Sequence, residues 1–371
     1  MKRRLLELLC CPVCQGTLRL DVFREADEIE EGCLTCVGCA RTYPVIGGIP
    51  RMLPDELAHL VPGYHPAFFR THAEAMRSFL GRCRPPQRSA WWRAESRTVK
   101  SYSYQWRKFK HMLPEWEETF LHSVYPVTPG FFRGQAGLDA GCGFGRSMFY
   151  AASYGAEIIG LDLSEAVEAA RENVGHLPTA HVVQGDIFHP PVRDGALDFV
   201  YSIGVLHHLP NPREGFLRLA KLLAPGAPIF IWVYSRGRGR QIACFEFVRA
   251  ISTHLPLRAL DGVCWVLAAG HWVLWILPYR FLNRFRVTRA LARRIPFTFY
   301  APYPFHVLHS GWVDHLSVPL ANYYKQEIVA AWLQEAGLER VVTDKEWGKY
   351  GGGRALGHAL APREREVAVN A

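Results

Sequence analysis

The stretch from Ala136 to Ser164 constrains the fold of this chain more than any other. An apolar run ends at Asp139, a glycine-rich turn and a helix-forming segment follow, and a second apolar run ends at Asp162. Glycines allow the backbone to approach a ligand closely, and the start of the next helix offers free N–H groups. In an open parallel sheet, ligands bind beyond the carboxyl ends of the strands, and an acid about 20 residues past the glycines suits ribose hydroxyls. We therefore predict an α/β fold with a nucleotide-type site at this turn.

The spacing of the glycines separates two kinds of nucleotide site. A dinucleotide fingerprint needs G-x-G-x-x-G, and Arg146 stands where its third glycine would be. The stretch instead reads D-x-G-x-G-x-G, which resembles motif I of the class I S-adenosylmethionine (SAM) methyltransferases, in particular the type 11 group. The resemblance implies a cationic sulfonium cofactor, for which a nearby acid is electrostatically suitable.

Further segments resemble that family in the same order. HVVQGDIF (181–188) is similar to its third strand and the acid that follows, 197–212 to its fourth strand and loop, and 217–234 to a helix, turn and fifth strand. The resemblance implies a Rossmann-like sheet of seven strands whose first five lie within 131–234. The cofactor residues that it implies are Asp139, Gly141, Gly143, Gly145, Asp162, Leu163, Asp186, Ile187 and Ser202.

The first 53 residues carry a metal-binding pattern. Six of the ten cysteines lie within the first 39 residues, and two C-x-x-C pairs stand about 20 residues apart, which is typical of a zinc ribbon. Cys10 and Cys33 are spare, and Cys33 also forms a C-x-x-C with Cys36. The segment from Cys36 to Pro50 resembles the small zinc-ribbon activators of tRNA and protein methyltransferases, and this favours one structural Zn²⁺ on Cys11, Cys14, Cys36 and Cys39.

The chain begins with basic residues and a few leucines. That apolar run is shorter than the roughly 7–15 residues of a signal-peptide core. We expect a cytoplasmic protein with reduced thiols, in which clustered cysteines bind metal and do not form disulfides.

Residues 54–130 read as a connector divided by prolines. Two explanations are open for SYSYQWRKF (101–109), an ordinary amphipathic helix or a lid over the cofactor. Related methyltransferases cover the cofactor with a segment of the type S-x-x-Y-x-W, and this resemblance implies Tyr104 and Trp106 as cofactor contacts.

Residues 235–320 interrupt the pattern of the family. They hold eleven arginines, no lysine and three acidic residues, a local excess of eight positive charges against nine for the whole chain. Within them, 262–278 is almost wholly apolar and contains Trp265, Trp272 and Trp275. Seventeen residues are at the lower limit for crossing a bilayer. We expect either a helix pair covering the acceptor pocket or a segment that docks on an anionic membrane surface, with a nucleic-acid surface as a third reading.

The last part of the chain, 321–371, reads as a helix followed by the sixth and seventh strands. His207 and His208 follow the fourth strand, where the acceptor of the methyl group is expected. Histidine titrates near pH 6.5, so either side chain could act as a base at neutral pH. His208 is our first candidate for a catalytic residue and His207 the second; packing of the loop is the alternative.

Three functions compete. The first is methyl transfer from SAM to a small-molecule or lipid-linked acceptor, with peripheral contact to the inner face of an anionic membrane. The second is an RNA methyltransferase in which the ribbon recognises the substrate. The sequence S-I-G-V-L-H-H after strand four lacks the N-P-P-Y type motif of amino-directed base methylases, and the insertion is too apolar for a duplex-facing surface, so nucleic acid is disfavoured. The third is a SAM-binding scaffold without catalysis.

Overall fold

The structure is a computed structural model that describes residues 1–83, 90–237, 239–344 and 352–360. Arg238, one of the eleven arginines of the insertion, lies outside the described residues, as does the end of the predicted C-terminal segment beyond 360.

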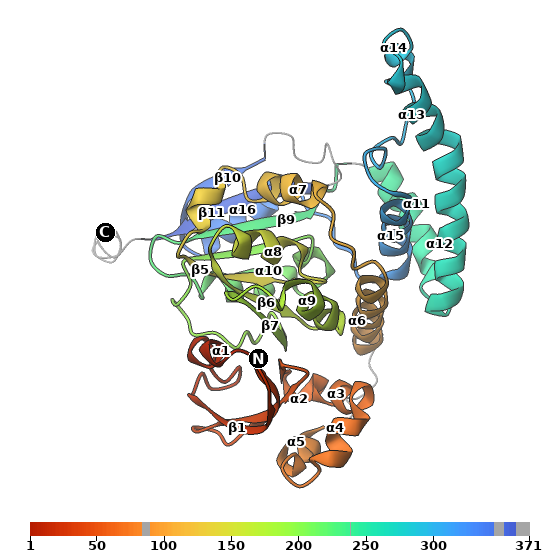
Figure 1. Cartoon of the computed structure of the whole chain (residues 1–371). Coiled ribbons are helices and arrows are strands. Elements are labelled where there is room, and N and C mark those ends of the chain that lie inside the picture. The colour runs from red at the N-terminus through yellow and green to blue at the C-terminus, as the bar shows by residue number, and fades with distance from the viewer. Residues whose placement is uncertain (84–89, 238, 345–351, 361–371) are drawn as a thin grey trace.

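One continuous sheet organises the described part of the chain (Figure 1). Its order is β1-β2-β3-β4-β7-β6-β5-β8-β9-β11-β10. The strands are β1 (Leu18–Glu25), β2 (Ile29–Cys36), β3 (Thr42–Ile46), β4 (Ile49–Met52), β5 (Ala136–Ala140), β6 (Glu157–Asp162), β7 (Ala180–Gly185), β8 (Phe199–Ile203), β9 (Pro228–Tyr234), β10 (Leu338–Thr343) and β11 (Gly352–Ala359).

Seven of these strands form the predicted Rossmann-like sheet, and the fold class is confirmed. The strands from β7 to β9 run parallel, and β11 joins β9 antiparallel and is followed by β10. Apolar residues of α7 (Glu115–Ser123), α8 (Arg146–Ser153) and α9 (Ala166–Val174) share one core cluster with the strands. Residues of α10 (Pro212–Ala220) and α16 (Gln326–Glu335) belong to a second cluster. The helices therefore form two separate hydrophobic cores with the strands, one that contains α7, α8 and α9 and one that contains α10 and α16.

Local signals place the helix starts around the sheet. The side chain of Asn211 accepts a hydrogen bond from the Glu214 N–H, and Pro212 takes the first helical position of α10. An Asn cap satisfies an otherwise free N–H group, and proline lacks the N–H that would remain free there. The loop after β8 is therefore held by the start of α10.

The ribbon is joined to the methyltransferase-type sheet by its last strand. β4 pairs in parallel with β7, with Arg51 opposite Gln184 and Met52 opposite Gly185. The sequence predicted a separate N-terminal ribbon, and it contained no signal for this pairing. The ribbon thus covers the β7 edge, which would otherwise expose unpaired N–H and C=O groups.

Short helices connect the ribbon to the rest of the chain. These are α2 (Asp55–Ala58), α3 (Leu60–Tyr64), α4 (Pro66–Thr71) and α5 (Arg77–Arg82), whereas α1 (Arg3–Leu8) precedes the strands of the ribbon. The chain turns between α4 and α5. Buried residues of α2 to α5 form a common core with Cys33 and Ile46 of the ribbon, so this part of the connector packs on the ribbon.

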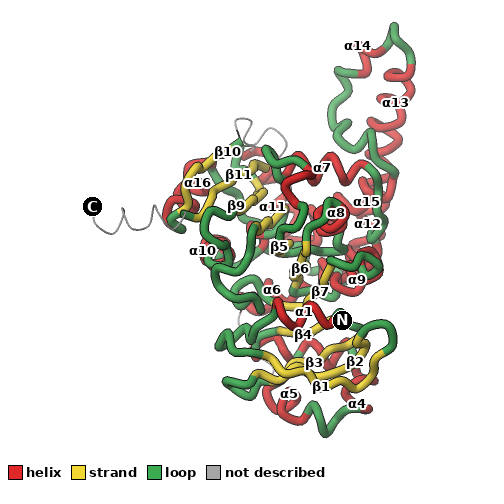
Figure 2. Tube along the Cα trace, turned by 60° about the vertical axis from the view of Figure 1, so that its left-hand side comes forward, coloured by secondary structure: helices red, strands yellow, loops and turns green. Residues whose placement is uncertain are grey.

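The insertion stands beside the sheet as a group of helices (Figures 1 and 2). It comprises α11 (Gly239–Ser252), α12 (Leu257–His271), a π-helical turn η3 (Trp272–Ile276), α13 (Leu277–Arg284), α14 (Arg289–Ala292) and α15 (Phe305–Ser317). The long helix α6 (Ala90–Lys108) lies between α9 and α15. Two 3-10 turns, η1 (Pro129–Phe132) and η2 (Leu206–His208), complete the described elements.

Candidate active site and zinc ribbon

Four cysteine sulfurs converge at the end of the ribbon. The Sγ atoms of Cys11, Cys14, Cys36 and Cys39 all lie within 4.8 Å of one another. Cys14 Sγ is 3.4 Å from Cys36 Sγ, and Cys11 Sγ is 3.6 Å from Cys39 Sγ. Four thiolates at this spacing fit a tetrahedral structural zinc site with no open position. The predicted ligand set is confirmed as the cluster that can hold zinc.

The spare cysteines lie elsewhere. Cys10 is buried, and its N–H donates to Pro191 O. Cys33 is buried in the core shared with α2 to α5. Its Sγ contacts Thr35 and the Leu34 carbonyl, and Cys33 is not one of the four clustered cysteines. The choice of Cys36 over Cys33 is therefore the one that the geometry supports.

The glycine turn after β5 forms one wall of a large cavity. Gly141, Gly143 and Gly145 all have positive φ, which favours glycine. A Cβ atom on Gly141 would lie 2.3 Å from Val205 Cγ2, and one on Gly143 would lie 3.4 Å from the Trp106 ring. The turn is thus tightly packed; Gly141 and Gly143 line the cavity, whereas Gly145 packs against Ala170 and Val174 of α9.

Asp162 stabilises this turn from the end of β6. Its Oδ2 accepts a hydrogen bond from the Gly143 N–H at 2.9 Å, and its Oδ1 accepts from the Ser164 N–H and hydroxyl. A carboxylate offers about four acceptor positions, so Asp162 retains capacity for a ligand hydroxyl. Burial raises the pKa of Asp162, and the three donors oppose that shift.

Asp139, the second-last residue of β5, carries a side-chain oxygen that accepts no hydrogen bond from the described residues. Its side chain is buried and lines the cavity, and Oδ2 has no hydrogen-bond partner among the described residues. Burial raises the pKa of Asp139 to about 7. A ligand cation would compensate this cost of burying the carboxylate. An aminoacid-sulfonium cofactor, which carries an ammonium group, fits this position.

The predicted residues after β7 also reach the cavity. Asp186 and Ile187 line it, as does Leu163 after β6. Asp186 Oδ2 lies 2.9 Å from His189 Nδ1, and this contact raises the pKa of His189. The chain therefore brings two acids to the same cavity, Asp162 at the end of β6 and Asp186 directly after β7.

Four predicted residues lie away from the cavity lining: Gly145, Ser202, Tyr104 and His207. Ser202 is buried in β8, where its hydroxyl donates to the Ala140 carbonyl and supports the turn from below. Tyr104 donates from its hydroxyl to Asp261 of the insertion. His207 is fully buried against the Tyr234 ring, with 3.8 Å between the ring centroids, and neither of its ring nitrogens has a hydrogen-bond partner within the described ranges.

Trp106 lines the cavity as predicted, but its aromatic neighbour there is Tyr102 and not Tyr104. The Tyr102 and Trp106 rings are stacked, with their centroids 6.3 Å apart. Residues four apart share one face of a helix. The i, i+4 spacing within α6 was the signal that could have selected Tyr102 from the sequence.

His208 faces the cavity with a defined tautomer. It lines the cavity, and its Nδ1 lies 2.6 Å from the Leu320 carbonyl. A carbonyl only accepts, so Nδ1 carries the proton and Nε2 is the nitrogen that can accept one. Burial lowers the pKa of His208, opposed by Asp314, so the neutral form is present at pH 7.

Asp314 of α15 is a cavity residue that the sequence reading missed. Its Oδ2 accepts a hydrogen bond from the Tyr234 hydroxyl at 3.0 Å, and Tyr102 and His208 also line this part of the cavity. Asp314 is more than 100 residues from His208 in the sequence, and no motif marks it. The insertion thus contributes a carboxylate to the predicted acceptor side.

The cavity has a volume of about 1490 Å³. Pockets for drug-sized ligands typically measure about 300–1,000 Å³. The space is therefore large enough for a nucleoside cofactor at the glycine turn together with a second ligand beside His208.

Comparisons with known proteins agree with both parts of the site. Residues 138–231 match the family described as a methyltransferase domain, and residues 2–48 match the family described as Trm112p-like protein. A UPF0434 protein of Cupriavidus metallidurans is 46% identical over 63 residues, 17% of this chain and 81% of the relative. A probable chloroplastic tocopherol O-methyltransferase of Oryza sativa subsp. japonica is 38% identical over 100 residues, 25% of this chain and 27% of the relative.

A solved complex between the Haloferax volcanii Trm112 methyltransferase activator and a methyltransferase is also similar. It has 15% identity and a TM-score of 0.42, covering 71% of this chain and 98% of the other. The chain spans less than a third of the length of the first curated relatives that it matches.

The glycine turn lies in a methyltransferase domain, residues 138–231, and the four clustered cysteines lie in a Trm112-like domain, residues 2–48. Through this N-terminal ribbon the chain belongs to the family of its UPF0434 relative, of which it covers 81%.

The role of Asp162 can be tested by cofactor affinity. Asp162→Ala is expected to weaken SAM binding by about 10- to 100-fold, because a hydrogen bond to a charged group contributes about 1.5–3 kcal/mol. Isothermal titration calorimetry with SAM measures this. Asp198→Ala is a matched control, since Asp198 Oδ2 accepts from the Ala136 N–H at the other end of β5 and is not a cavity residue. Equal affinity in wild type and Asp162→Ala would refute the assignment.

Proposed function

We propose that this protein transfers a methyl group from SAM to a hydroxyl or amino group of a small-molecule or lipid-linked acceptor, with His208 as the base. The observation that carries the proposal is the neutral His208 imidazole, held by Leu320 in the tautomer that can accept a proton, on the wall of a cavity that also contains the glycine turn. An oxygen or nitrogen acceptor has a proton to lose, whereas a carboxylate acceptor needs no base.

SAM, when bound, supplies a methyl group that its sulfonium charge already activates. The residues of the chain then orient the acceptor, exclude water and take up its proton. His208 Nε2 is proposed to receive that proton, and the Asp314 carboxylate, on the same cavity wall, would stabilise the imidazolium form. Tyr234 donates to Asp314 and so holds the carboxylate in place.

We propose that the cofactor contacts Asp139, Gly141, Gly143, Gly145, Asp162, Leu163, Asp186, Ile187 and Trp106. Tyr102 replaces Tyr104 in this proposal because it lines the cavity beside Trp106. Ser202 and His207 are proposed to support the turn and the loop from the protein interior.

The apolar part of the cavity favours an amphiphilic acceptor. Trp232, Ile242, Phe245, Trp275 and Phe297 line it together with the polar groups. The relative from rice is named a tocopherol O-methyltransferase, and that name supports transfer to oxygen on an acceptor of similar polarity.

The substrate class is tested by following the methyl group. The purified zinc-containing protein would be incubated with tritiated SAM and cell extract separated into small-molecule, lipid, RNA and protein fractions. Label in the small-molecule or lipid fraction, absent with Asp162→Ala, supports the proposal. Label in RNA or protein would establish the competing class of methyltransferase, and SAM binding without label in any fraction would indicate a scaffold.

The pH dependence tests the base. A protonated His208 cannot accept a proton, so the rate is expected to fall as the pH decreases through its pKa. Burial places that pKa below the usual value of about 6.5, so the fall in rate should occur at a lower pH than it would for an unperturbed histidine. His208→Gln should remove this acidic limb and lower the rate by about 10²- to 10⁴-fold. His176→Gln, an exposed histidine outside the cavity lining, should leave the profile unchanged, and an unaltered profile in His208→Gln would exclude His208 as the base.

A further inference from the structure

A long helix of the insertion extends past the edge of the domain. α12, η3 and α13 form a continuous helical segment, Leu257–Arg284, which continues to α14 (Figures 1 and 2). By length and composition this helix could cross a membrane, with 22% of its most apolar window buried inside the protein. We call residues 257–294 the insertion arm.

One face of the arm is apolar and exposed. The side chains of Val263, Val266, Leu274, Leu277 and Phe281 follow one another at intervals of three, four or eight residues, which places them on one side of a helix. Val266, Leu274 and Phe281 are each 63–64% exposed. Monomeric soluble proteins rarely expose an apolar stripe of this length, and such patches mark interaction sites.

The opposite face of the arm is covered by protein. Leu260, Cys264, Ala268 and Ile276 are buried, and they share core clusters with α15 residues such as Leu308 and Val313. A helix that crosses a bilayer alone would contact lipid on all sides. The arm instead offers lipid one face, as an interfacial helix does.

The arm also carries an unbalanced positive charge. From Gly262 to Val313 the sequence has six arginines and no aspartate, glutamate or lysine. Arg280 is used inside the protein, where it donates to the carbonyls of Ala301 and Tyr303. The other five are exposed, and no ion pair is recorded for them within the described ranges: Arg284, Arg286, Arg289, Arg293 and Arg294.

The exposed arginines continue the apolar stripe at its C-terminal end. Arg284 follows Phe281 by three residues, so it lies on the same side of α13. Of the remaining four, Arg286 lies on the turn, Arg289 begins α14, and Arg293 and Arg294 directly follow α14. The guanidinium group forms paired hydrogen bonds to phosphate. An apolar stripe that ends in arginines is complementary to the acyl and phosphate layers of an anionic lipid surface.

The catalytic cavity reaches the base of the arm. His271 and Trp275 of the arm, with Phe297 and Phe299 of the following loop, line the same cavity as His208. Phe297 and Phe299 are also exposed on the outside. The cavity therefore extends from the glycine turn to the base of the insertion arm.

We propose that the insertion arm docks on the surface of an anionic membrane, with the stripe from Val263 to Phe281 at the acyl boundary and the five exposed arginines on lipid phosphates. Docking brings the arm-side end of the cavity to the membrane, where an amphiphilic acceptor is found. The lipid contact itself requires neither the acceptor nor catalysis, so it goes beyond the proposed reaction.

The test is flotation of the full zinc-containing chain with phosphatidylcholine vesicles, with and without phosphatidylglycerol. Flotation is expected only with the anionic lipid at about 0.1 M salt and should be lost near 1 M salt, where the screening length falls from about 10 Å to about 3 Å. Absence of flotation at low salt would overturn the proposal. Flotation that resists both high salt and alkaline carbonate would also overturn it, because the helix would then be inserted.

Two sets of variants locate the contact. Val266→Glu, Leu274→Glu and Phe281→Glu combined should abolish flotation, whereas Val22→Glu, Ile328→Glu and Val342→Glu, which change exposed apolar residues elsewhere by the same charge, should not. Neutralising Arg284, Arg289 and Arg293 to glutamine should weaken vesicle binding about 100-fold, since each contributes about a factor of five. The same change at the exposed Arg70, Arg77 and Arg133 should have little effect.

A second copy of the chain is the competing occupant of the stripe. Sedimentation velocity of the wild type and of the stripe variant distinguishes the two. A wild-type dimer that the stripe variant converts to a monomer, without flotation of either protein, would assign the surface to self-association. SAM affinity should be the same in all of these variants, because none of the changed residues lines the cavity; failure of flotation therefore leaves the proposed methyl transfer untouched.

Discussion

Replacing Cys36 with serine is expected to release zinc and to unfold the ribbon. The four cysteines form a closed site, and structural zinc contributes about 10–16 kcal/mol in small zinc domains. Removing one thiolate leaves three ligands and an open position. Metal analysis should fall from one zinc per chain to none, and hydrogen exchange should increase over β1 to β4.

Cys33→Ser is the matched control. Cys33 and Cys36 are both buried and both belong to β2, but only Cys36 is in the cluster. Cys33→Ser should keep its zinc while losing some stability from the core with α2 to α5. Zinc retained in Cys36→Ser, or lost only in Cys33→Ser, would show that the ligand set is wrong.

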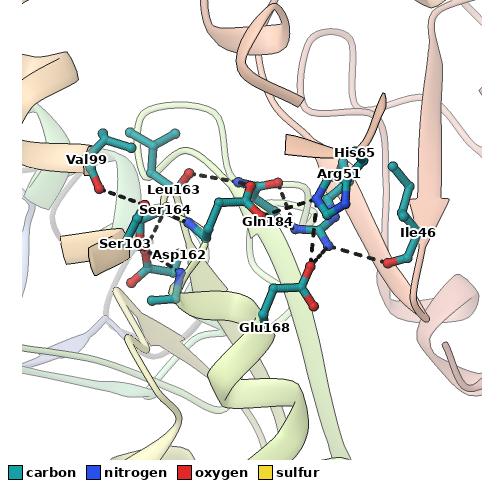
Figure 3. Close-up of polar contacts among 12 residues, drawn as sticks. Ile46, Arg51, His65, Val99, Ser103, Asp162, Leu163, Ser164, Glu168 and Gln184 are labelled. Atoms are coloured by element: carbon teal, nitrogen blue, oxygen red, sulfur yellow. Dashed lines mark hydrogen bonds and ion pairs between the residues drawn. The ribbon is translucent and has the colours of Figure 1, made fainter. Parts of the chain in front are cut away.

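The second large effect is expected at Arg51, where the ribbon meets the cofactor half. Arg51 is fully buried; it donates to Gln184 Oε1 at 3.1 Å, forms a short ion pair with Glu168 and lies 3.7 Å from Glu165 (Figure 3). Glu165 is also buried, and its pKa is lowered, with His65 and Arg51 opposing the effect of desolvation. Removing the arginine would leave Glu165 without its main buried cation.

Arg51→Ala should therefore lower the free energy of unfolding by about 3–5 kcal/mol, the cost typical of a buried ion pair that loses one partner. Urea denaturation measures this. Arg19→Ala is the control, because Arg19 pairs with Asp21 on the surface of the ribbon and exposed pairs contribute at most about 1 kcal/mol. Equal stability of the two variants would show that the Arg51 network does not hold the ribbon to the sheet.

The same network suggests why the ribbon matters to the cofactor site. Gln184 also donates to the Leu163 carbonyl, and the Glu165 N–H donates to Ser103 of α6 (Figure 3). The first contact is made to Leu163, within the segment from Asp162 to Ser164, and the second is made by Glu165, which directly follows that segment. Arg51→Ala is therefore expected to weaken SAM binding as well, and calorimetry on the folded variant would show a change in affinity that Arg19→Ala lacks.

Local sequence patterns were sufficient to predict the positions of several residues of the site. The C-x-x-C pairs indicated a zinc ribbon, because each knuckle is formed by neighbouring residues, and the resemblance to the zinc-ribbon activators selected Cys36 and Cys39 over Cys33. The glycine spacing identified the turn, and the residue that ends β6 identified Asp162, because strand ends on one sheet edge converge. Each of these features is formed by residues only a few positions apart in the sequence, or by two parallel strands that a single helix connects.

Other assignments needed the packing of distant segments. Tyr104 and Tyr102 lie on the same helix, and only the positions of α12 and the glycine turn decide which of them reaches the cavity. His207 and His208 are adjacent, and the contact of His208 with Leu320, over 112 residues, separates their roles. Asp314 had no motif because its function depends on where α15 packs.

By itself, the sequence determined the α/β fold class and the glycine turn from periodicity and short-range spacing, and its resemblance to two families implied the seven-stranded sheet and the set of four clustered cysteines. The tertiary structure alone decided that β4 pairs with β7, that Arg51 is buried between the two parts, and that one face of the insertion arm remains uncovered. The reason is physical: a strand edge, a buried charge and an apolar helix face acquire their energies from the partner that meets them, and that partner lies far away in the chain.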